Sequence, residues 1–350
     1  MKLNNDDFDE YTNRDHSDQL QMSKFLQVSK EAQRWCELME CETVSDLNEL
    51  ILNGKIRELI RINEALHEKS FSKIADMICY KGAKAVVLAG PSSSGKTTSA
   101  NRLATQLRVH GRKPILLSLD DYYVDRDKIA PDADGKMDYE HINTIDTALF
   151  RKHMQQLISG KPVVLPLFNF KSGRRQWQSK AVQMTENTVF IIEGLHALNP
   201  ILLPQNLESA LVFRLYVCPL LPLNMDAHNR ISGSLLRLLR RIVRDYENRG
   251  ASVQQTIQMW DSVRRGEKAW IYPFQESADF IFNSATLYEL SILKKHIFPL
   301  LNAIQPEDAY YPETSKLVNA LESVLEAEVE DEIPPTSIVR EFIGGNAFYK

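Results

Sequence analysis

The most constraining feature of this sequence is the segment Gly90–Thr97, which reads GPSSSGKT. It matches the phosphate-binding loop (P-loop) pattern, in which a glycine, four residues and a second glycine are followed by lysine and threonine. An apolar run over 84–89 precedes the loop, and a helical pattern over 97–110 follows it. This order predicts a buried parallel strand that leads through a tight loop into a helix, whose N-terminus favours an anion.

The loop residues each have an expected role toward a nucleotide. Glycine lets the backbone curl so that successive N–H groups point at phosphate oxygens. Lys96 would reach the β- and γ-phosphates, and Thr97 would hold Mg²⁺, so ATP and Mg²⁺ are the expected cofactors. The nucleotide-binding residues predicted in this segment are Gly90, Ser92, Ser93, Ser94, Gly95, Lys96, Thr97 and Thr98.

Strand and helix patterns alternate from Lys84 onward, which favours an α/β fold of the P-loop NTPase class with a doubly wound parallel sheet. We expect a helical N-terminal extension (1–80), a P-loop domain (81–305) and a C-terminal tail (306–350) with an acidic helix over 315–328. The N-terminal helices are read as a structural cover, with a partner-binding scaffold as the alternative. Strands are expected at 84–89, 114–119, 188–193, 211–217 and 278–282, a hairpin within 161–185, and further helices near 145–159, 223–249 and 287–301.

Composition excludes several classes of protein. The 350 residues are 43% hydrophobic and 25% charged, with a formal net charge of −4, which is ordinary for a globular protein and not typical of a nucleic-acid binder. No apolar run approaches the roughly 20 residues of a membrane span, and the acidic start is not a signal peptide. Four cysteines without metal-ligand spacing indicate reduced thiols. Together these features predict a cytoplasmic location.

Acidic residues follow two of the predicted strands, at the strand ends where α/β sheets bind ligands. Asp120 is the preferred general base because it is closest to the strand end, and Asp121 is the alternative. Either carboxylate could instead cap a turn. Glu193, before Gly194, ends an apolar strand in the Walker-B pattern and is expected to position Mg²⁺. His196 is read as a structural residue.

Several arginines recur at helical spacing within the predicted helix over 223–249, and Arg249 is the last residue of that range. Residues with this spacing share one face of a helix, and an anion would relieve their mutual repulsion. A lid over ATP phosphates, a solvated basic helix and an RNA-facing stripe are the three readings of this face. The residues at helical spacing are Arg237, Arg240, Arg241 and Arg244.

Taken in order, these segments resemble the uridine kinase and phosphoribulokinase family of P-loop kinases, which includes nucleoside kinases. The resemblance implies that Asp120 activates a ribose 5′-hydroxyl, with Lys96 and Arg244 stabilising the developing charge. It implies a nucleoside pocket formed by Asp138, Tyr123, Phe170 and Arg175, a metal site at Thr97 and Glu193, and a lid containing Arg241, Arg244 and Arg249. The matching segments are 90–97, 120–123, 138–141, 166–175, 193–194 and 237–250.

The sequence departs from typical uridine kinases at two positions, because Gly173 stands where a histidine is usual and Ala251 where an arginine is usual. The segments 64–69 and 340–345 are similar to the bacterial long-form subgroup of uridine kinase-like proteins. The resemblance implies ATP-dependent phosphorylation of a nucleoside, a small-molecule substrate rather than a membrane or nucleic-acid partner, and a homo-oligomer as a common family state. A kinase for another hydroxylated metabolite, such as a sugar phosphate, and a non-catalytic nucleotide-dependent RNA-binding protein are the alternatives.

Overall fold

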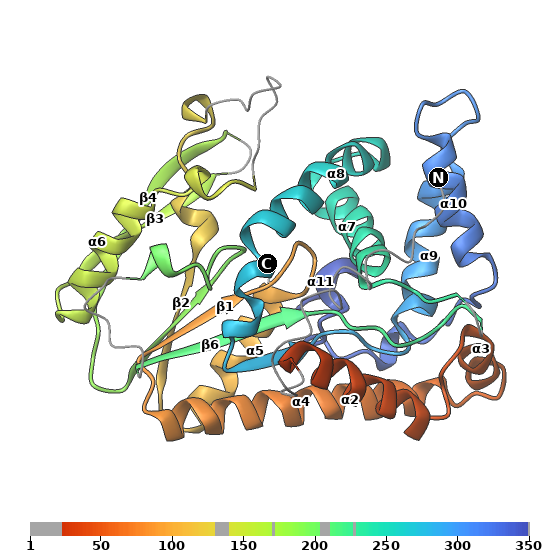
Figure 1. Ribbon diagram of the computed structural model, residues 1–350, viewed down its shortest axis with the longest axis horizontal. Helices are drawn as coiled ribbons and strands as arrows, with labels where there is room; N and C mark the ends of the chain where they lie inside the picture. The colour runs from red at the N-terminus through yellow and green to blue at the C-terminus, as the bar shows by residue number, and fades with distance from the viewer. Residues whose placement is uncertain (1–22, 130–139, 170–171, 204–210, 227–228, 349–350) are drawn as a thin grey trace, which may run out of the picture.

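A parallel sheet of five strands forms the centre of the computed structural model, which describes residues 23–129, 140–169, 172–203, 211–226 and 229–348. The strand order is β2-β5-β1-β6-β7, and all neighbouring strands run parallel. Figure 1 labels β2, β1 and β6 of this sheet. This arrangement confirms the predicted α/β class. The strands are β1 (Ala85–Ala89), β2 (Lys113–Ser118), β5 (Thr188–Glu193), β6 (Val212–Cys218) and β7 (Phe280–Asn283).

Helices cover the sheet, and the central strand β1 is therefore buried along its whole length. Its side chains alternate between two hydrophobic clusters, with Val86 and Leu88 in one and Ala85, Val87 and Ala89 in the other. The cluster around Val86 and Leu88 includes side chains from α3 (Val44–Leu52), α4 (Ile56–Lys81), α5 (Lys96–Val109), α7 (Gly233–Arg249), α9 (Glu289–Asn302) and α10 (Tyr311–Glu322).

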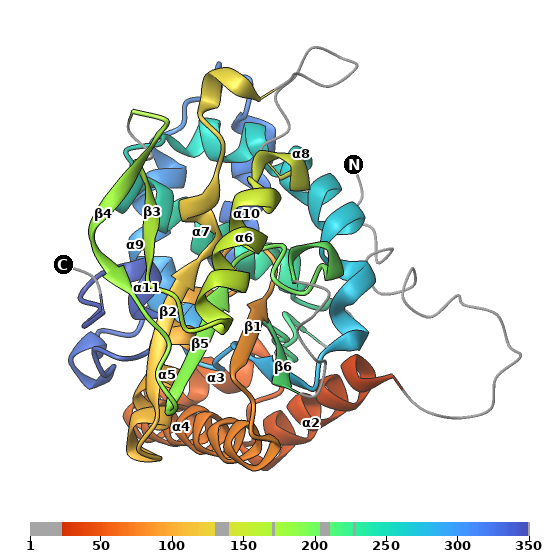
Figure 2. The ribbon, with the colours of Figure 1, turned by 90° about the vertical axis from the view of Figure 1, so that its left-hand side faces the viewer.

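The opposite cluster packs against α6 (Thr147–Ile158) and the antiparallel hairpin of β3 (Val163–Asn169) and β4 (Arg174–Val182). Figure 2 shows this hairpin as a separate two-stranded sheet beside α6. The predicted hairpin is thus present, with longer strands than the sequence pattern indicated. The helix α2 (Lys24–Leu38) packs against the edge strand β7, which agrees with the expected helical N-terminal extension.

Three helices differ from the sequence expectation. The helix α8 (Val253–Trp270) was not predicted, although Ser252 and Gln255 form a capping box at its start. The helix α7 begins only at Gly233, after the N-cap Ser232. The helix α10 (Tyr311–Glu322) begins and ends earlier than the acidic helix expected over 315–328, because Pro312 fits a first helical turn.

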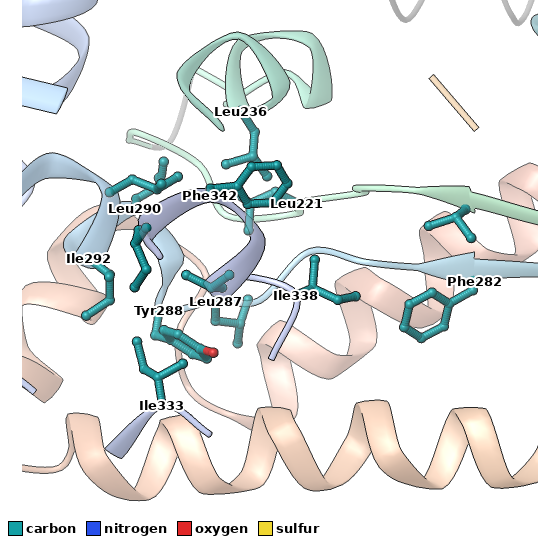
Figure 3. Close-up of a cluster of buried hydrophobic side chains, with 14 of the residues drawn as sticks. Leu221, Leu236, Phe282, Leu287, Tyr288, Leu290, Ile292, Ile333, Ile338 and Phe342 are labelled. Carbon is teal, nitrogen blue, oxygen red and sulfur yellow. The ribbon is translucent and has the colours of Figure 1, made fainter. Parts of the chain in front are cut away.

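The C-terminal segment belongs to the same core as the N-terminal helices. Glu64 of α4 accepts hydrogen bonds from the hydroxyls of Tyr288 (2.7 Å) and Ser337 (2.6 Å), and all three side chains are buried. Figure 3 shows Phe342, from the short helix α11 (Arg340–Ile343), beside Leu236 of α7. Within the described part of the chain, no helix is long and apolar enough to cross a bilayer.

This packing predicts a large loss of stability when Phe342 is truncated. The ring is fully buried, and the guanidinium of Arg240 lies 4.9 Å from its centroid. We expect Phe342→Ala to lower the free energy of unfolding by about 3–5 kcal/mol through the cavity it leaves, measured by urea denaturation. The control Tyr80→Ala removes an aromatic ring that is 97% exposed and should change the stability by less than about 0.5 kcal/mol.

Candidate active site

The P-loop connects β1 to α5 and passes so close to other segments that two of its positions require glycine. A Cβ on Gly90 would lie 2.1 Å from the carbonyl oxygen of Val217 in β6. Gly95 has a φ of +86°, and its Cβ would lie 2.5 Å from Cγ2 of Ile338. The two glycines of the sequence pattern are therefore explained by sterics before any ligand is considered.

A buried ion pair holds the outer side of the P-loop. Glu267 of α8 accepts a hydrogen bond from the backbone N–H of Ser92 (3.0 Å), and Arg237 of α7 donates to the Ser92 carbonyl (3.1 Å). The two side chains pair with each other at 2.8 Å, and Tyr272 donates its hydroxyl to the same carboxylate. Since both charges are almost completely buried, this pair fixes the loop within the protein interior.

Two further arginines of α7 contact the same loop. Arg240 donates to the carbonyl of Ser93 (3.3 Å) and pairs with the buried Glu289 at 2.7 Å. Arg241 donates to the side-chain hydroxyl of Ser92 at 2.9 Å. The arginine face predicted from the sequence is therefore neither a solvated helix nor an exposed stripe at these positions, because its side chains are buried against the P-loop.

The three arginines predicted for the lid meet at one carboxylate, that of Asp245. Arg241, Arg244 and Arg249 lie 3.2, 2.7 and 3.6 Å from its oxygens. Burial opposes the ionisation of Asp245, but the three positive charges outweigh it and hold the pKa of Asp245 below its ordinary value. The charge of Arg244 lowers the pKa of Arg249, whose side chain is half exposed. The predicted lid residues thus form a cationic group that is assembled without a ligand.

Acidic side chains and Lys96 gather at the carboxyl ends of β2 and β5. Ser118 and Glu193 are register partners at these ends, and the Ser118 hydroxyl donates to the Glu193 carboxylate (2.8 Å). Burial, and then the negative charge of Asp120, raise the pKa of Glu193 to about 7, against the opposing charge of Lys96. Burial lowers the pKa of Lys96, whose ammonium group donates to the carbonyl of Pro91 (2.9 Å).

The neighbouring carboxylates Asp120 and Asp121 have different surroundings. Asp121 accepts a hydrogen bond from the backbone N–H of Phe168 (3.1 Å), so it ties the turn after β2 to the hairpin. Burial raises the pKa of Asp121. The Asp120 charge instead acts on Lys96, Glu193 and Tyr123. Of the two carboxylates, Asp120 is therefore the one whose charge acts on the P-loop lysine.

The residues predicted for the acceptor pocket are only partly described. Asp138 and Phe170 lie outside the described residues. Tyr123 is partly buried, with its ring 5.6 Å from that of Phe168 in an edge-to-face arrangement. Arg175 donates to the carbonyls of Tyr122 (3.0 Å) and Tyr123 (2.9 Å) and pairs with Asp146 at 3.0 Å. These contacts hold the Tyr122–Tyr123 backbone and engage both terminal nitrogens of the guanidinium.

The glycine that replaces the usual histidine has a structural reason. Gly173 has a φ of +66°, and a Cβ there would lie 2.6 Å from Cδ of Arg126. Its N–H donates to the carbonyl of Asn169 (2.8 Å) in the turn between β3 and β4. A histidine at this position would therefore be strained.

The oxygen donors near the P-loop fit a magnesium ion that is shared with phosphates. Among residues that the structure describes, no group of three or more His, Cys, Asp or Glu side chains could hold a metal by itself. Mg²⁺ in phosphoryl-transfer sites is usually bound through one or two protein oxygens, substrate phosphates and water. Thr97 and Glu193 are a donor set of that kind, since both are hard oxygen ligands.

Several residues of the site could not be found from local sequence patterns. Glu267 and Glu289 come from α8 and α9, far along the chain from the P-loop, and no motif surrounds them. Glu341 of α11 accepts a hydrogen bond from the backbone N–H of Thr98 at 3.1 Å. The arginine spacing on α7 was the single sequence signal for this network, because it required anionic partners of some kind.

The P-loop between β1 and α5, acidic strand ends and an arginine helix define a P-loop kinase of the α/β class. The sequence profile of the Phosphoribulokinase / Uridine kinase family matches residues 85–291, and the chain belongs to this family.

Two proteins that are similar in sequence agree with this assignment. A uridine kinase from Brevibacillus brevis is 31% identical over 195 residues, which cover 55% of this chain and 81% of that protein. A uridine kinase from Aliivibrio salmonicida is 31% identical over 223 residues, covering 62% and 95%. The crystal structure of a proposed fructose transport system kinase from Silicibacter sp. superposes with a TM-score of 0.45 and 20% identity, covering 61% of this chain and 98% of that one.

The buried pair predicts that Glu267→Gln is strongly destabilising. The substitution removes one charge and leaves the Arg237 guanidinium buried without its anion, which commonly costs about 3–5 kcal/mol. Urea denaturation would measure the loss. The matched control is Glu247→Gln on the exposed part of α7, which should stay within about 0.5 kcal/mol of the native chain. Equal stabilities for the two variants would contradict the role given to the pair.

The same pair predicts a pH dependence. Burial opposes ionisation of Glu267, but the charge and hydrogen bonds of Arg237 hold its pKa below the ordinary value of 4.5. This stabilisation is therefore complete above pH 4.5 and is lost as the pH falls through the lower pKa of the folded state. The stability difference between the native chain and Glu267→Gln should be constant from neutral pH to about pH 5 and shrink below it. A difference that grows on acidification would refute this assignment.

Proposed function

We propose that this kinase transfers the γ-phosphoryl group of ATP to the 5′-hydroxyl of a nucleoside, giving a nucleoside monophosphate and ADP. The observation that carries the proposal is the pairing of Ser118 and Glu193 at the carboxyl ends of β2 and β5, beside Asp120 and the P-loop residue Lys96, whose charges act on Glu193. A hydroxyl acceptor needs a base beside the phosphate site, and we assign that role to Asp120. The relatives named uridine kinase suggest a nucleoside as the acceptor.

In this mechanism, Asp120 accepts the proton of the attacking hydroxyl. The hydroxyl oxygen forms a bond to the γ-phosphorus while the bond to the β–γ bridging oxygen breaks, and ADP leaves. Lys96 and Arg244 stabilise the charge that spreads over the phosphoryl oxygens. Thr97 and Glu193 would hold Mg²⁺, which supplies positive charge to the β- and γ-phosphates when bound.

The remaining predicted residues are assigned roles from their contacts or from the family resemblance. We infer that Gly90 and Ser92–Thr98 line the phosphate site. The N–H groups of Ser93–Thr98 would donate to phosphates, since Glu267 takes the N–H of Ser92, and Arg241 and Arg249 would close over the nucleotide beside Arg244. On the acceptor side, Tyr123 offers an aromatic surface, and Arg175 keeps the Tyr122–Tyr123 backbone in place. Asp138 and Phe170 are proposed as acceptor-binding residues on the family resemblance.

A second candidate is a kinase for another hydroxylated metabolite, such as a sugar phosphate. The turn at Gly173 favours it, since this chain lacks the side chain that usually contacts a pyrimidine there. The third reading from the sequence, an RNA-binding stripe on α7, loses support because Arg237, Arg240 and Arg241 are buried and paired with carboxylates.

Product analysis would separate these acceptors. The purified chain is incubated with Mg-ATP and each of a set of nucleosides and anionic sugars, and ADP release and product mass are measured. A nucleoside 5′-monophosphate supports the main proposal. ADP release with a sugar phosphate and with none of the nucleosides supports the second candidate. The absence of ADP release with every acceptor contradicts both.

The base assignment predicts different effects for two adjacent substitutions. Asp120→Asn should lower kcat by about a hundredfold or more, because the contribution of a general base is typically in that range. Its nucleotide affinity should change much less. The matched control Asp121→Asn keeps an oxygen that can accept the N–H of Phe168 and should retain most of the kcat. A near-native kcat for Asp120→Asn would remove Asp120 from the mechanism.

A further inference from the structure

The C-terminal segment places a carboxylate on the first turn of α5. Glu341 accepts hydrogen bonds from the backbone N–H of Thr98 (3.1 Å) and from its hydroxyl (2.6 Å). The first N–H groups of a helix lack intrahelical acceptors, and in a P-loop they face the α- and β-phosphates of a nucleotide. One donor expected to serve a phosphate is therefore already bound by an anion of the same chain.

The segment that carries Glu341 is seated firmly on the loop. We call residues 337–346 the C-terminal latch. Ile338 of the latch lies against Gly95, so closely that a Cβ on that glycine would be 2.5 Å away. Asn346 donates its side-chain amide to the hydroxyl of Thr98 (3.2 Å). The latch thus touches the P-loop and α5 through three of its residues, and Glu341 is the charged one.

The core beneath the latch fixes its position. Phe342 is fully buried beside Arg240, which donates to the carbonyl of Ser93 in the loop. Ser337 donates to the buried carboxylate of Glu64. Because Phe342 and Ser337 are anchored, we expect only the Glu341 side chain and the residues after Gly345 to move. Gly344 and Gly345 precede that end, and their φ values of +88° and +72° suit glycine.

The charge of Glu341 acts within the catalytic centre. It opposes the lowering of the pKa of Lys96 and adds to the raised pKa of Glu193. A negative charge on the first turn of α5 repels the phosphates that the loop would otherwise attract. A phosphate oxygen and the Glu341 carboxylate also cannot both take the single N–H of Thr98.

We propose that Glu341 is an internal competitor of the nucleotide. It occupies the Thr98 donors in the nucleotide-free chain and leaves them when a nucleotide phosphate binds, which loosens the end of the C-terminal latch. Because this release costs free energy, it opposes nucleotide binding. The chain therefore binds nucleotide more weakly than it would without the Glu341 carboxylate. The inference rests on the proposed nucleotide binding by the P-loop, but not on the nature of the acceptor.

Equilibrium binding of Mg-ADP to purified variants, measured by calorimetry at fixed salt, tests the competition. We expect Glu341→Ala to lower the Kd about ten- to a hundredfold, the range that a hydrogen bond to a charged group commonly contributes. Glu341→Gln keeps an oxygen acceptor without the charge and should give a smaller decrease. The matched control Glu332→Gln alters a carboxylate that pairs with Arg57 and Arg61 and should leave the Kd unchanged.

Hydrogen exchange of the backbone amides of Ala347 and Phe348 reports the release directly. Both amides are hydrogen-bonded in the nucleotide-free chain, to Pro335 and to the Asn346 side chain. Mg-ADP should speed their exchange in the native chain, and Glu341→Ala should show faster exchange without nucleotide. If Glu341→Ala does not fold, Glu341→Gln, which preserves shape, carries both measurements.

Three results would overturn the inference. They are an unchanged or higher Kd in a folded Glu341 variant, slower exchange of the two amides on nucleotide binding, and no nucleotide binding by either the native chain or the variants. The proposed function fails differently. If Mg-ADP binds more tightly to Glu341→Ala but no nucleoside is phosphorylated, the competition stands and the nucleoside acceptor is rejected.

Discussion

The buried ion pair between Arg237 and Glu267 is the interaction on which the nucleotide site depends. A P-loop turns its N–H groups toward a ligand, so its outward polar groups need partners elsewhere. Glu267 takes the N–H of Ser92 and Arg237 takes its carbonyl, while the two charges neutralise each other. Desolvating two charges is costly unless every hydrogen bond is made, and here Tyr272 supplies a further donor. The backbone of the loop at Ser92 is therefore held in place by the protein itself.

The helix α7 extends this design to the rest of the cationic site. Its arginines project onto the P-loop at one end and onto Asp245 near the other, and each has a carboxylate partner. The helix thus connects the support of the loop to the charges proposed to stabilise phosphoryl transfer. Groups that are held in place in advance need little reorganisation when charge develops in the transition state. Substitutions at the supporting carboxylates should consequently impair both stability and catalysis.

The sequence allowed the sheet and the P-loop to be predicted because both rest on local patterns, as in β1 and Gly90–Thr97. Contacts between distant segments could not be predicted this way. Arg175 has the chemistry of a ligand-binding residue, yet it binds the backbone of Tyr122 and Tyr123. Glu341 lies 243 residues after Thr98, and no spacing rule relates them. Helix α8 was missed although the capping box of Ser252 and Gln255 marks its start, and the acidic helix was placed too late because Pro312 lies in the first turn of α10.

The shared carboxylate of Glu64 has a consequence for how the protein is made. Its hydroxyl partners are Tyr288 and Ser337, which are synthesised long after α4 has left the ribosome. At roughly 5–20 residues per second, α4 and its early partner Arg102 wait tens of seconds for the two hydroxyls that complete the hydrogen bonding of this acid. Complete docking of the N-terminal helices is therefore a late step that follows synthesis of the C-terminus. A chain that ends before residue 337 would keep Tyr288 and Arg102 as partners of this buried carboxylate but would lose the hydroxyl of Ser337.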